Sequence, residues 1–192
     1  MGRQLLADSE LPNHLINREP EKIRPCINCF VCVAQNFWNG EPVCAVNARL
    51  GNYDTKIENA KRSKNVVIVG AGPAGLECAR VASNRGHEVT LLEKMESLGG
   101  TTLFSSLTTP KNGELINWFE TVLKDSEVLI KKGFVADTDS IMSLSPDVVV
   151  IATGSGASKS SLKGSELKHV LTRDQLRSLL QKTRTSKIPQ EI

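Results

Sequence analysis

Two short runs of mostly β-branched residues stand out against the mixed polar and apolar remainder of the chain. Residues 66–69 read VVIV, and residues 147–152 read DVVVIA. Continuous apolar runs of this length are typical of strands that are buried on both faces of a parallel sheet. The second run therefore predicts a central strand. Residues 89–92 (VTLL) predict a further strand, and residues 128–130 predict another.

Apolar positions at helical spacing lie between these strands and predict two helices, over residues 74–85 and 114–124. The apolar positions are Leu76, Ala79, Val81 and Ala82 in the first helix and Leu115, Trp118, Phe119 and Val122 in the second. Gly86 follows the first helix, where a glycine commonly ends a helix. We expect the two aromatic residues of the second helix to belong to the core rather than to stack on a cofactor.

The glycines after the first strand have the spacing of a dinucleotide-binding turn. Gly70, Gly72 and Gly75 form G-x-G-x-x-G, in which the first glycine permits the turn, the second lets backbone approach a pyrophosphate, and the third lets the helix pack closely. Glu93, 23 positions after Gly70, stands where an acidic residue binds the ribose. A glycine-rich turn that binds nothing would explain the glycines but not this spacing. An acid at the ribose repels a 2′-phosphate, so we do not expect NADP at this site.

Two further stretches are expected near the same edge of the sheet. Gly99 and Gly100 follow Glu93 closely, which suits a loop whose backbone passes near a phosphate or a flavin-linked group. A flexible loop is the alternative. Thr153 and Gly154 follow a predicted strand at its carboxyl end, where ligands bind in open α/β sheets.

Composition and charge narrow the class of protein. The chain has 192 residues, of which 40% are hydrophobic and 23% charged, as in an ordinary globular protein of one domain or slightly more. A net charge of +3 gives no reason to expect a nucleic acid or a membrane surface as partner. No apolar run approaches the ~18–20 residues of a membrane span. The N-terminus lacks the apolar core of a signal peptide, which favours a cytoplasmic protein.

Four of the five cysteines lie within residues 26–44, here called the cysteine segment. Cys26, Cys29 and Cys32 form C-x2-C-x2-C, and Cys44 follows after eleven residues. Three thiolates at this spacing can surround a [4Fe–4S] cluster while the fourth arrives from a distant turn, which is the interpretation we favour. Zinc is more often bound by two separated pairs. Zinc and free or disulfide-linked thiols stay open as alternatives.

The other residues near these motifs have simpler interpretations. Hydrophobic residues between the cysteines would shield a cluster from solvent, although ordinary core packing predicts the same residue types; they are Phe30, Val31, Val33, Phe37 and Trp38. Cys78 lies on the first predicted helix and is expected to be a small buried hydrophobe. Residues 172–175 (TRDQ) resemble a capping box and predict a short helix that includes Leu176, Leu179 and Leu180. The tail from Gln181 onward is expected to be disordered or a linker.

In combination, these motifs resemble the NADH:flavin oxidoreductases, a family that includes 2,4-dienoyl-CoA reductase, 2-enoate reductase and trimethylamine dehydrogenase. The resemblance covers roughly residues 2–156 and rests on GRQLLADSELPN, IRPCINC, VVIVGAGPAGLECARVASNRGHEVTLLEK with LGG, and PDVVVIATG. It implies a TIM barrel with FMN and substrate, then a [4Fe–4S] segment, then a doubly wound region that binds FAD (or ADP in some members) and NAD(P)H. Electrons then pass from NAD(P)H through FAD, the cluster and FMN to an activated carbon–carbon double bond.

Carried over residue by residue, the resemblance implies cofactor and metal sites but no catalytic residue, because the residues that reduce the double bond lie in the barrel. The expected cluster ligands are Cys26, Cys29, Cys32 and Cys44. The expected FAD or ADP site is Gly70, Gly72, Pro73, Ala74, Gly75, Glu93, Lys94, Gly100, Thr153 and Gly154. Gly2 and Arg3 match the family's Gly-Arg that touches the FMN phosphate. The FMN barrel and the NAD(P)H domain are then expected in another segment or on another chain.

The fold class expected is α/β, an incomplete Rossmann-like doubly wound parallel sheet preceded by a small cysteine-rich segment. The expected divisions are the end of a TIM barrel (1–25), the iron–sulfur segment (26–52), a linker (53–65), the first part of the FAD-binding domain (66–156) and a partly helical tail (157–192). The expected function is the FAD and [4Fe–4S] electron-transfer portion of an NAD(P)H-dependent oxidoreductase of activated C=C bonds. A non-redox ADP- or FAD-binding module with structural zinc, or an inactive fragment, is the alternative.

Overall fold

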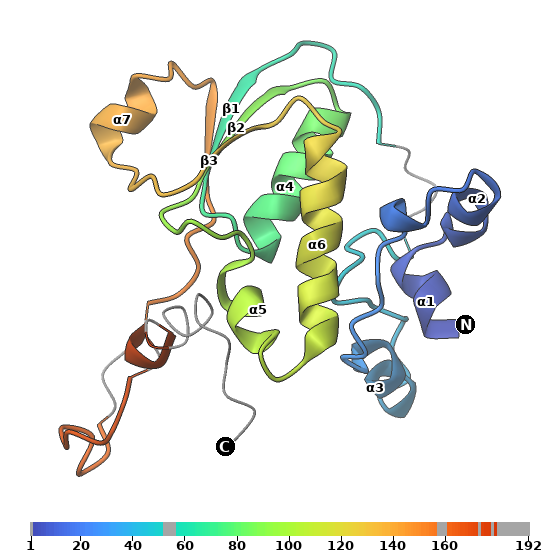
Figure 1. The fold of residues 1–192 in the computed structure, drawn as a ribbon. Coiled ribbons are helices and arrows are strands. Elements are labelled where there is room, and N and C mark those ends of the chain that lie inside the picture. The colour runs from blue at the N-terminus through green and yellow to red at the C-terminus, as the bar shows by residue number, and fades with distance from the viewer. Residues whose placement is uncertain (1, 52–56, 157–160, 173, 178, 180–192) are drawn as a thin grey trace. The chain divides into compact units, whose positions relative to one another are not determined.

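A computed structural model describes residues 2–51, 57–156, 161–172, 174–177 and 179 of the chain (Figure 1). The chain divides into two compact units, Met1–Thr153 and Gly154–Ile192. The first unit contains all the strands and helices labelled below. In the second unit, the described residues are irregular apart from a short helical stretch that begins at residue 174.

The centre of the first unit is a four-stranded sheet with the strand order β3-β2-β1-β4 (Figure 1). The strands are β1 (Asn65–Val69), β2 (Glu88–Leu92), β3 (Leu129–Lys131) and β4 (Val148–Ile151). Each neighbouring pair is parallel, and Val67, for example, lies between Thr90 of β2 and Val149 of β4. Parallel strands need crossover connections, which the helices supply, so the predicted Rossmann-like α/β class is confirmed.

Helices α4 (Pro73–Asn84) and α6 (Pro110–Lys124) lie side by side against one face of the sheet (Figure 1). Their buried side chains include Leu76 and Ala79 on α4 and Leu115, Ile116, Trp118, Phe119 and Leu123 on α6. Both predicted helices and the core positions of the two aromatic residues are therefore confirmed. Gly86 ends α4 as expected, with a φ of +80° and its N–H bonded to the carbonyl of Ser83 at 2.8 Å. The short helices α5 (Gly100–Ser105) and α7 (Thr138–Met142) complete this region, with α7 across the strands from α4 and α6.

The N-terminal part of the chain packs on α6 rather than folding around a core of its own. It forms α1 (Gly2–Ala7), α2 (Leu11–Ile16), the 3-10 helix η1 (Pro20–Lys22) and α3 (Val31–Phe37). Ala7 is buried in the same hydrophobic cluster as the sheet. The indole N–H of Trp118 on α6 donates to the carbonyl of Lys22 at 2.7 Å. Helices of five to seven residues are too short to be stable alone. They are also too short to show a helical period of hydrophobic positions, so the sequence did not predict them.

The prediction of a central strand over residues 147–152 is wrong for the sheet of the described residues. β4 is an edge strand that pairs with β1, and Val149 and Ile151 are 38% and 68% exposed. The β-branched run predicted a strand correctly, but residue type does not report whether a further strand covers its other side. The predicted strand over 128–130 is confirmed as β3, one residue further along.

The capping box expected near the C-terminus is confirmed in the second unit. The N–H of Thr172 donates to Gln175 Oε1 at 2.8 Å, and the N–H of Gln175 donates to Thr172 Oγ1 at 3.3 Å. Leu180 and residues 181–192, for which a helix end and a linker were predicted, lie outside the described residues. Among the helices of the described residues, none combines the length and the apolar character that a membrane crossing requires.

Replacing Trp118 with Phe tests the anchoring of the N-terminal part on α6. The change removes the N–H that bonds to Lys22 and leaves a gap beside Phe119, so we expect the free energy of unfolding to fall by ~1–3 kcal/mol. Urea unfolding followed by far-UV circular dichroism measures it. Trp38→Phe is the control, because Trp38 is 78% exposed, and it should change stability by less than ~0.5 kcal/mol. Equal midpoints for the two variants would contradict the anchoring role.

Candidate functional site

Residues 70–75, here called the glycine turn, comprise the connection from β1 to α4 and the first residues of α4, and they lie at the carboxyl end of β1. Gly70 has a φ of +104°, and a Cβ there would collide with the carbonyl oxygen of Ala152, which follows β4. A Cβ on Gly75 would collide with the carbonyl oxygen of Gly70. In contrast, a Cβ on Gly72 would meet nothing within 4 Å. Gly70 and Gly75 are thus required by close packing, while Gly72 leaves its backbone open to a ligand.

The N-terminus of α4 is arranged to receive an anion. Gly72 is the N-cap and supplies no side-chain hydrogen bond, and Pro73 begins the helix. The first bond of the helical ladder runs from the N–H of Leu76 to the carbonyl of Gly72 at 2.9 Å. The N–H groups of Ala74 and Gly75 precede this bond and therefore have no acceptor in the helix. Such N–H groups, with the positive end of the helix dipole, favour a phosphate.

Glu93 is a structural part of the glycine turn as well as a candidate ribose ligand. The residue is 7% exposed, and its carboxylate accepts the N–H of Ala71 at 2.7 Å and the N–H of Met95 at 2.9 Å. The two bonds go to different carboxylate oxygens, and each oxygen has a second lone pair that can accept a ribose hydroxyl. The spacing of Glu93 predicted the acid but not its bond to Ala71.

The second glycine loop, Gly99 and Gly100, lies against the glycine turn. The N–H of Gly99 donates to the carbonyl of Ala71 at 2.8 Å. A Cβ on Gly100 would lie 3.1 Å from the Cα of Gly72, so only glycine allows this approach without a shift. The loop is therefore held by backbone contacts to the residues that would carry the phosphates, with Leu98 buried beneath it.

A cavity of about 140 Å3 adjoins Glu93 at the ends of the strands. It is lined by Val69, Gly70, Leu92, Glu93, Lys94, Phe134, Val135, Ala136 and Thr153. Its volume is below the ~300–1,000 Å3 of whole small-molecule sites, so it has room for one part of a dinucleotide. Sequence analysis missed residues 134–136. These residues could have been predicted to lie at the site, because they follow β3 and the carboxyl ends of parallel strands share one edge of the sheet. Gly154, also expected at the site, begins the second unit with a φ of +73°.

The four clustered cysteines lie in the same unit as the glycine turn. All are free thiols; Cys29 is exposed, while Cys26, Cys32 and Cys44 are partly buried. Cys26 and Cys44 pack against the hydrophobic core. Asn28 and Phe30 have φ values of 55° and 60°, in the left-handed region, so the backbone changes direction on both sides of Cys29. Among the described residues, no three His, Cys, Asp or Glu side chains are grouped to hold a metal ion.

The hydrophobic residues of the cysteine segment are mostly exposed, so they do not pack in the core of the described residues. Phe37 and Trp38 are 83% and 78% exposed, and Phe30 and Val31 also face solvent. Cys78 on α4, by contrast, packs against the core as predicted. Burial raises the pKa of the Cys78 thiol and so favours its uncharged form.

Comparison with known proteins identifies the family of this chain. The family model described as pyridine nucleotide-disulphide oxidoreductase matches residues 45–109 and 64–188. Cinnamate reductase of Clostridium sporogenes is 38% identical over 170 residues, which are 86% of this chain and 26% of that protein. NADH oxidase of Thermoanaerobacter brockii is 39% identical over 175 residues, again 86% and 26%. The chain thus spans about a quarter of the length of these relatives.

Solved structures agree with this assignment. A 2-naphthoyl-CoA reductase in complex with 2-naphthoyl-CoA matches with a TM-score of 0.82 and 34% identity, over 86% of this chain and 26% of that one. Histamine dehydrogenase from Rhizobium sp. 4-9 matches with a TM-score of 0.78 and 26% identity, over 86% and 25%. The resemblance to flavin oxidoreductases that the motifs indicated is confirmed at the level of the family.

Glu93→Gln tests the structural part of the site without any ligand. An amide offers one acceptor oxygen and an NH2 group that only donates, so Ala71 or Met95 loses its partner. We expect the free energy of unfolding of the ligand-free chain to fall by ~1–3 kcal/mol, measured by urea unfolding. Glu88→Gln, at an exposed position of β2, is the matched control and should stay within ~0.5 kcal/mol of the unsubstituted chain. If Glu93→Gln leaves the free energy of unfolding unchanged, the bonds of Glu93 to Ala71 and Met95 do not stabilise the fold.

Proposed function

Because the chain belongs to the pyridine nucleotide-disulphide oxidoreductase family, we propose that it carries electrons between FAD and a [4Fe–4S] cluster in an NAD(P)H-dependent flavin oxidoreductase. Its relatives are named as reductases, oxidases and dehydrogenases, which supports a redox role. The observation that carries the proposal is the presence, in one compact unit, of a dinucleotide-type glycine turn and a segment with four free thiols.

The nucleotide half of the proposal uses the edge of the sheet. The pyrophosphate of FAD or ADP would lie against Pro73 and on the N–H groups of Ala74 and Gly75, near Gly100, and the adenosine ribose would bond to Glu93. Gly70, Thr153 and Lys94 line the cavity beside that carboxylate, which supports a place for the adenosine. Gly154 continues the chain from Thr153. An NADP 2′-phosphate would meet the carboxylate of Glu93 and be repelled.

The cysteine half of the proposal assigns Cys26, Cys29, Cys32 and Cys44 as cluster ligands. Thiolates are the donors that iron–sulfur clusters require. The changes of backbone direction on both sides of Cys29 would let successive thiols face one centre. In the present conformation the thiols do not converge, so side chains of the segment must turn when the cluster binds. A bound cluster supplies one-electron transfer.

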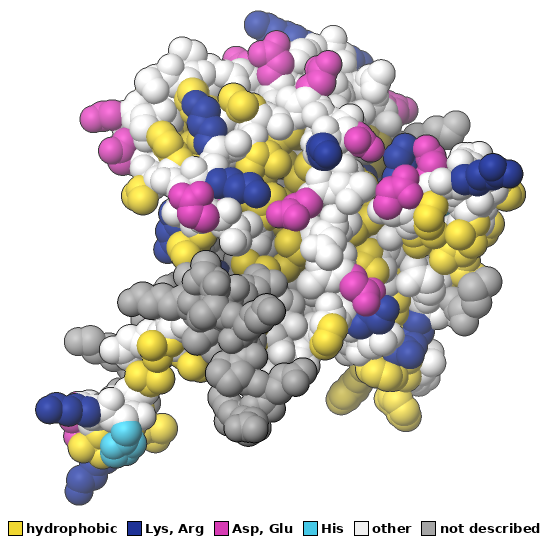
Figure 2. Space-filling view, in the orientation of Figure 1, with side chains coloured by type: hydrophobic (Ala, Val, Ile, Leu, Met, Phe, Trp, Pro, Cys, Tyr) yellow, Lys and Arg dark blue, Asp and Glu magenta, His cyan; other side chains and the backbone are white. Residues whose placement is uncertain are grey.

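The proposed substrate is an activated C=C bond of an enoate or a CoA thioester, reduced outside this chain. Cinnamate reductase and 2-naphthoyl-CoA reductase are named for substrates of this kind. The FMN barrel and the NAD(P)H domain would be supplied in cis or by another chain. Figure 2 shows hydrophobic side chains on the side of α1 and α2 and at the tip of α3. Exposed Leu15, Ile16, Phe37 and Trp38 support these as the surfaces that such domains cover.

We propose the corresponding organisation of the chain as residues 1–25 at the end of the barrel, 26–52 for the cluster, 53–65 as a linker, 66–156 for FAD and 157–192 as a tail. The buried contacts of the first unit join residues of the first, second and fourth divisions. The N-terminal residues are thus a folded part of the electron-transfer unit in this proposal.

Metal and sulfide content tests the proposal directly. The chain is purified without oxygen, and iron, zinc and acid-labile sulfide are measured together with the visible spectrum. We expect about four irons and four sulfides per chain and a broad absorbance that dithionite bleaches. One zinc per colourless chain would support the non-redox nucleotide module instead. If the chain contains neither iron nor zinc, the remaining interpretation is a nucleotide-binding remnant.

A further inference from the structure

Arg24 is a buried arginine that contacts four separate segments of the first unit. The residue is 7% exposed and lies two positions before Cys26. Its backbone N–H donates to Asp8 at 2.7 Å, and its carbonyl accepts the side chain of Gln4 at 2.7 Å. The same Gln4 amide accepts the N–H of Cys26 at 2.8 Å. The start of the cysteine segment is therefore fixed to the N-terminal helices on both sides of Pro25.

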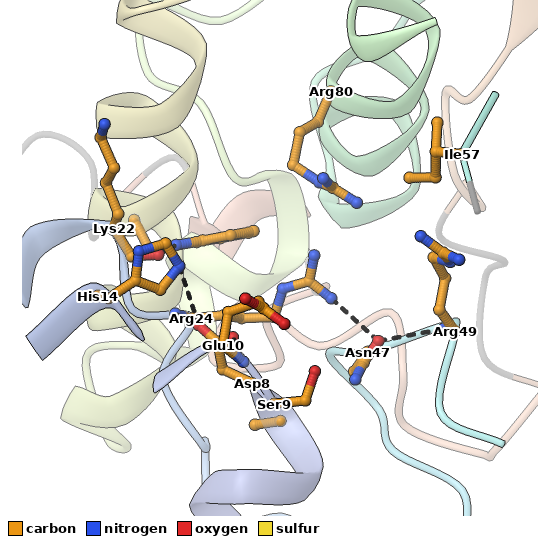
Figure 3. A pocket seen from close by; sticks show the side chains of 12 residues that line it. Asp8, Ser9, Glu10, His14, Lys22, Arg24, Asn47, Arg49, Ile57 and Arg80 are labelled. Atoms are coloured by element: carbon orange, nitrogen blue, oxygen red, sulfur yellow. Dashed lines mark hydrogen bonds and ion pairs between the residues drawn. The ribbon is translucent and has the colours of Figure 1, made fainter. Parts of the chain in front are cut away.

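The guanidinium bonds to residues that directly follow the cysteine segment. Its Nη1 donates to the carbonyl of Val46 at 2.8 Å and lies 3.4 Å from the side-chain oxygen of Asn47. These residues follow Cys44 by two and three positions. Arg24 thus joins the residues just before the first clustered cysteine to those just after the last one, and Figure 3 shows Arg24 pointing toward Asn47.

The same guanidinium reaches the helix that begins at the glycine turn. Its Nη2 lies 3.4 Å from Glu77 Oε1 on α4, and its plane covers the ring of Trp118 with 4.6 Å to the centroid. Arg80 also binds the Glu77 carboxylate, through Nη2 to Oε1 at 2.7 Å and through Nε to Oε2 at 2.9 Å. Glu77 stands two residues after Gly75, so it is rigidly connected to the phosphate-binding turn.

Arginine is the residue that suits this position. A buried cation needs charged and hydrogen-bonding partners, and burial lowers the pKa of the Arg24 guanidinium while Glu77 opposes that shift. A cavity of about 700 Å3 opens beside the group (Figure 3), so directional bonds and the contact with Trp118 define its position. A planar guanidinium can donate in several directions and stack on an indole at once, which the ammonium of a lysine cannot do.

We propose that Arg24 and Glu77 are a positioning pair that fixes the distance between the cysteine segment and the N-terminus of α4. The consequence for electron transfer rests on the proposed function, because transfer rates fall steeply with the distance between cofactors. The geometric part does not depend on either cofactor. Loss of the pair lets the cysteine segment move away from α4 while the sheet and the glycine turn stay in place.

Amide hydrogen exchange in the metal-free chain tests the geometric part. We compare Arg24→Lys and Glu77→Gln with Arg80→Gln, which removes a partner of Glu77 that does not contact the cysteine segment. Peptides that cover residues 24–26 and 44–47 should exchange roughly tenfold faster in the first two variants. Peptides from β1 and β2 report on global unfolding and should be unchanged, as should the peptides that cover residues 24–26 and 44–47 in Arg80→Gln. Glu77 is partly exposed, so Glu77→Gln keeps the test valid if Arg24→Lys fails to fold.

Unchanged exchange near the cysteines in Glu77→Gln, or the same acceleration in Arg80→Gln or in β1, would overturn the positioning pair. A second readout uses the chain loaded with FAD and cluster. In Arg24→Lys the rate at which photoreduced flavin bleaches the cluster absorbance should fall at least roughly tenfold, with cofactor content and reduction potentials unchanged. A rate equal to that of the unsubstituted chain would contradict the pair. If the unsubstituted chain takes up no cluster, the proposed function fails, and hydrogen exchange alone decides the inference.

Discussion

The buried carboxylate of Glu93 is the interaction on which the shape of the nucleotide edge depends. It bonds to the N–H of Ala71 inside the glycine turn, and the carbonyl of Ala71 in turn accepts the N–H of Gly99. The acidic side chain therefore holds the glycine turn, and the backbone of that turn holds the second glycine loop. Because the carboxylate keeps free lone pairs, the group that organises the site can also bind a ribose. Preorganisation of this kind lowers the cost of ordering the loops when a ligand binds.

A second constraint links this edge to the N-terminal part of the chain. The short helices before β1 have no core of their own, and they are held by Trp118 on α6 and by the contacts of Arg24. The cysteine segment is consequently attached at its base to α4, while its hydrophobic tip around Phe37 and Trp38 stays exposed. This division suits a segment that must keep a set position relative to one cofactor and still meet another domain.

The sequence predicted the parts of the fold that repeat with a simple period or spacing. G-x-G-x-x-G, the strands around it and Glu93 were identifiable because each depends on neighbours in the chain. The edge position of β4 was not, since it depends on whether another strand is present. The bond of Glu93 to Ala71, the lining by Phe134 and the contacts of Arg24 join residues distant in sequence, and no local pattern encodes them. The convergence of the four cysteines on one centre stays a prediction from their spacing and from the family resemblance.

Electron counting tests the central claim most directly. The chain, loaded anaerobically with FAD and with iron and sulfide, is titrated with dithionite while flavin and iron–sulfur absorbances and the electron paramagnetic resonance signal are recorded. A flavin and a redox-active cluster on one chain predict uptake of about three electron equivalents, two by the flavin and one by the cluster, with the resonance of a reduced cluster. Uptake of about two equivalents, by flavin alone and without that resonance, would contradict an electron-transfer role for the cysteine segment.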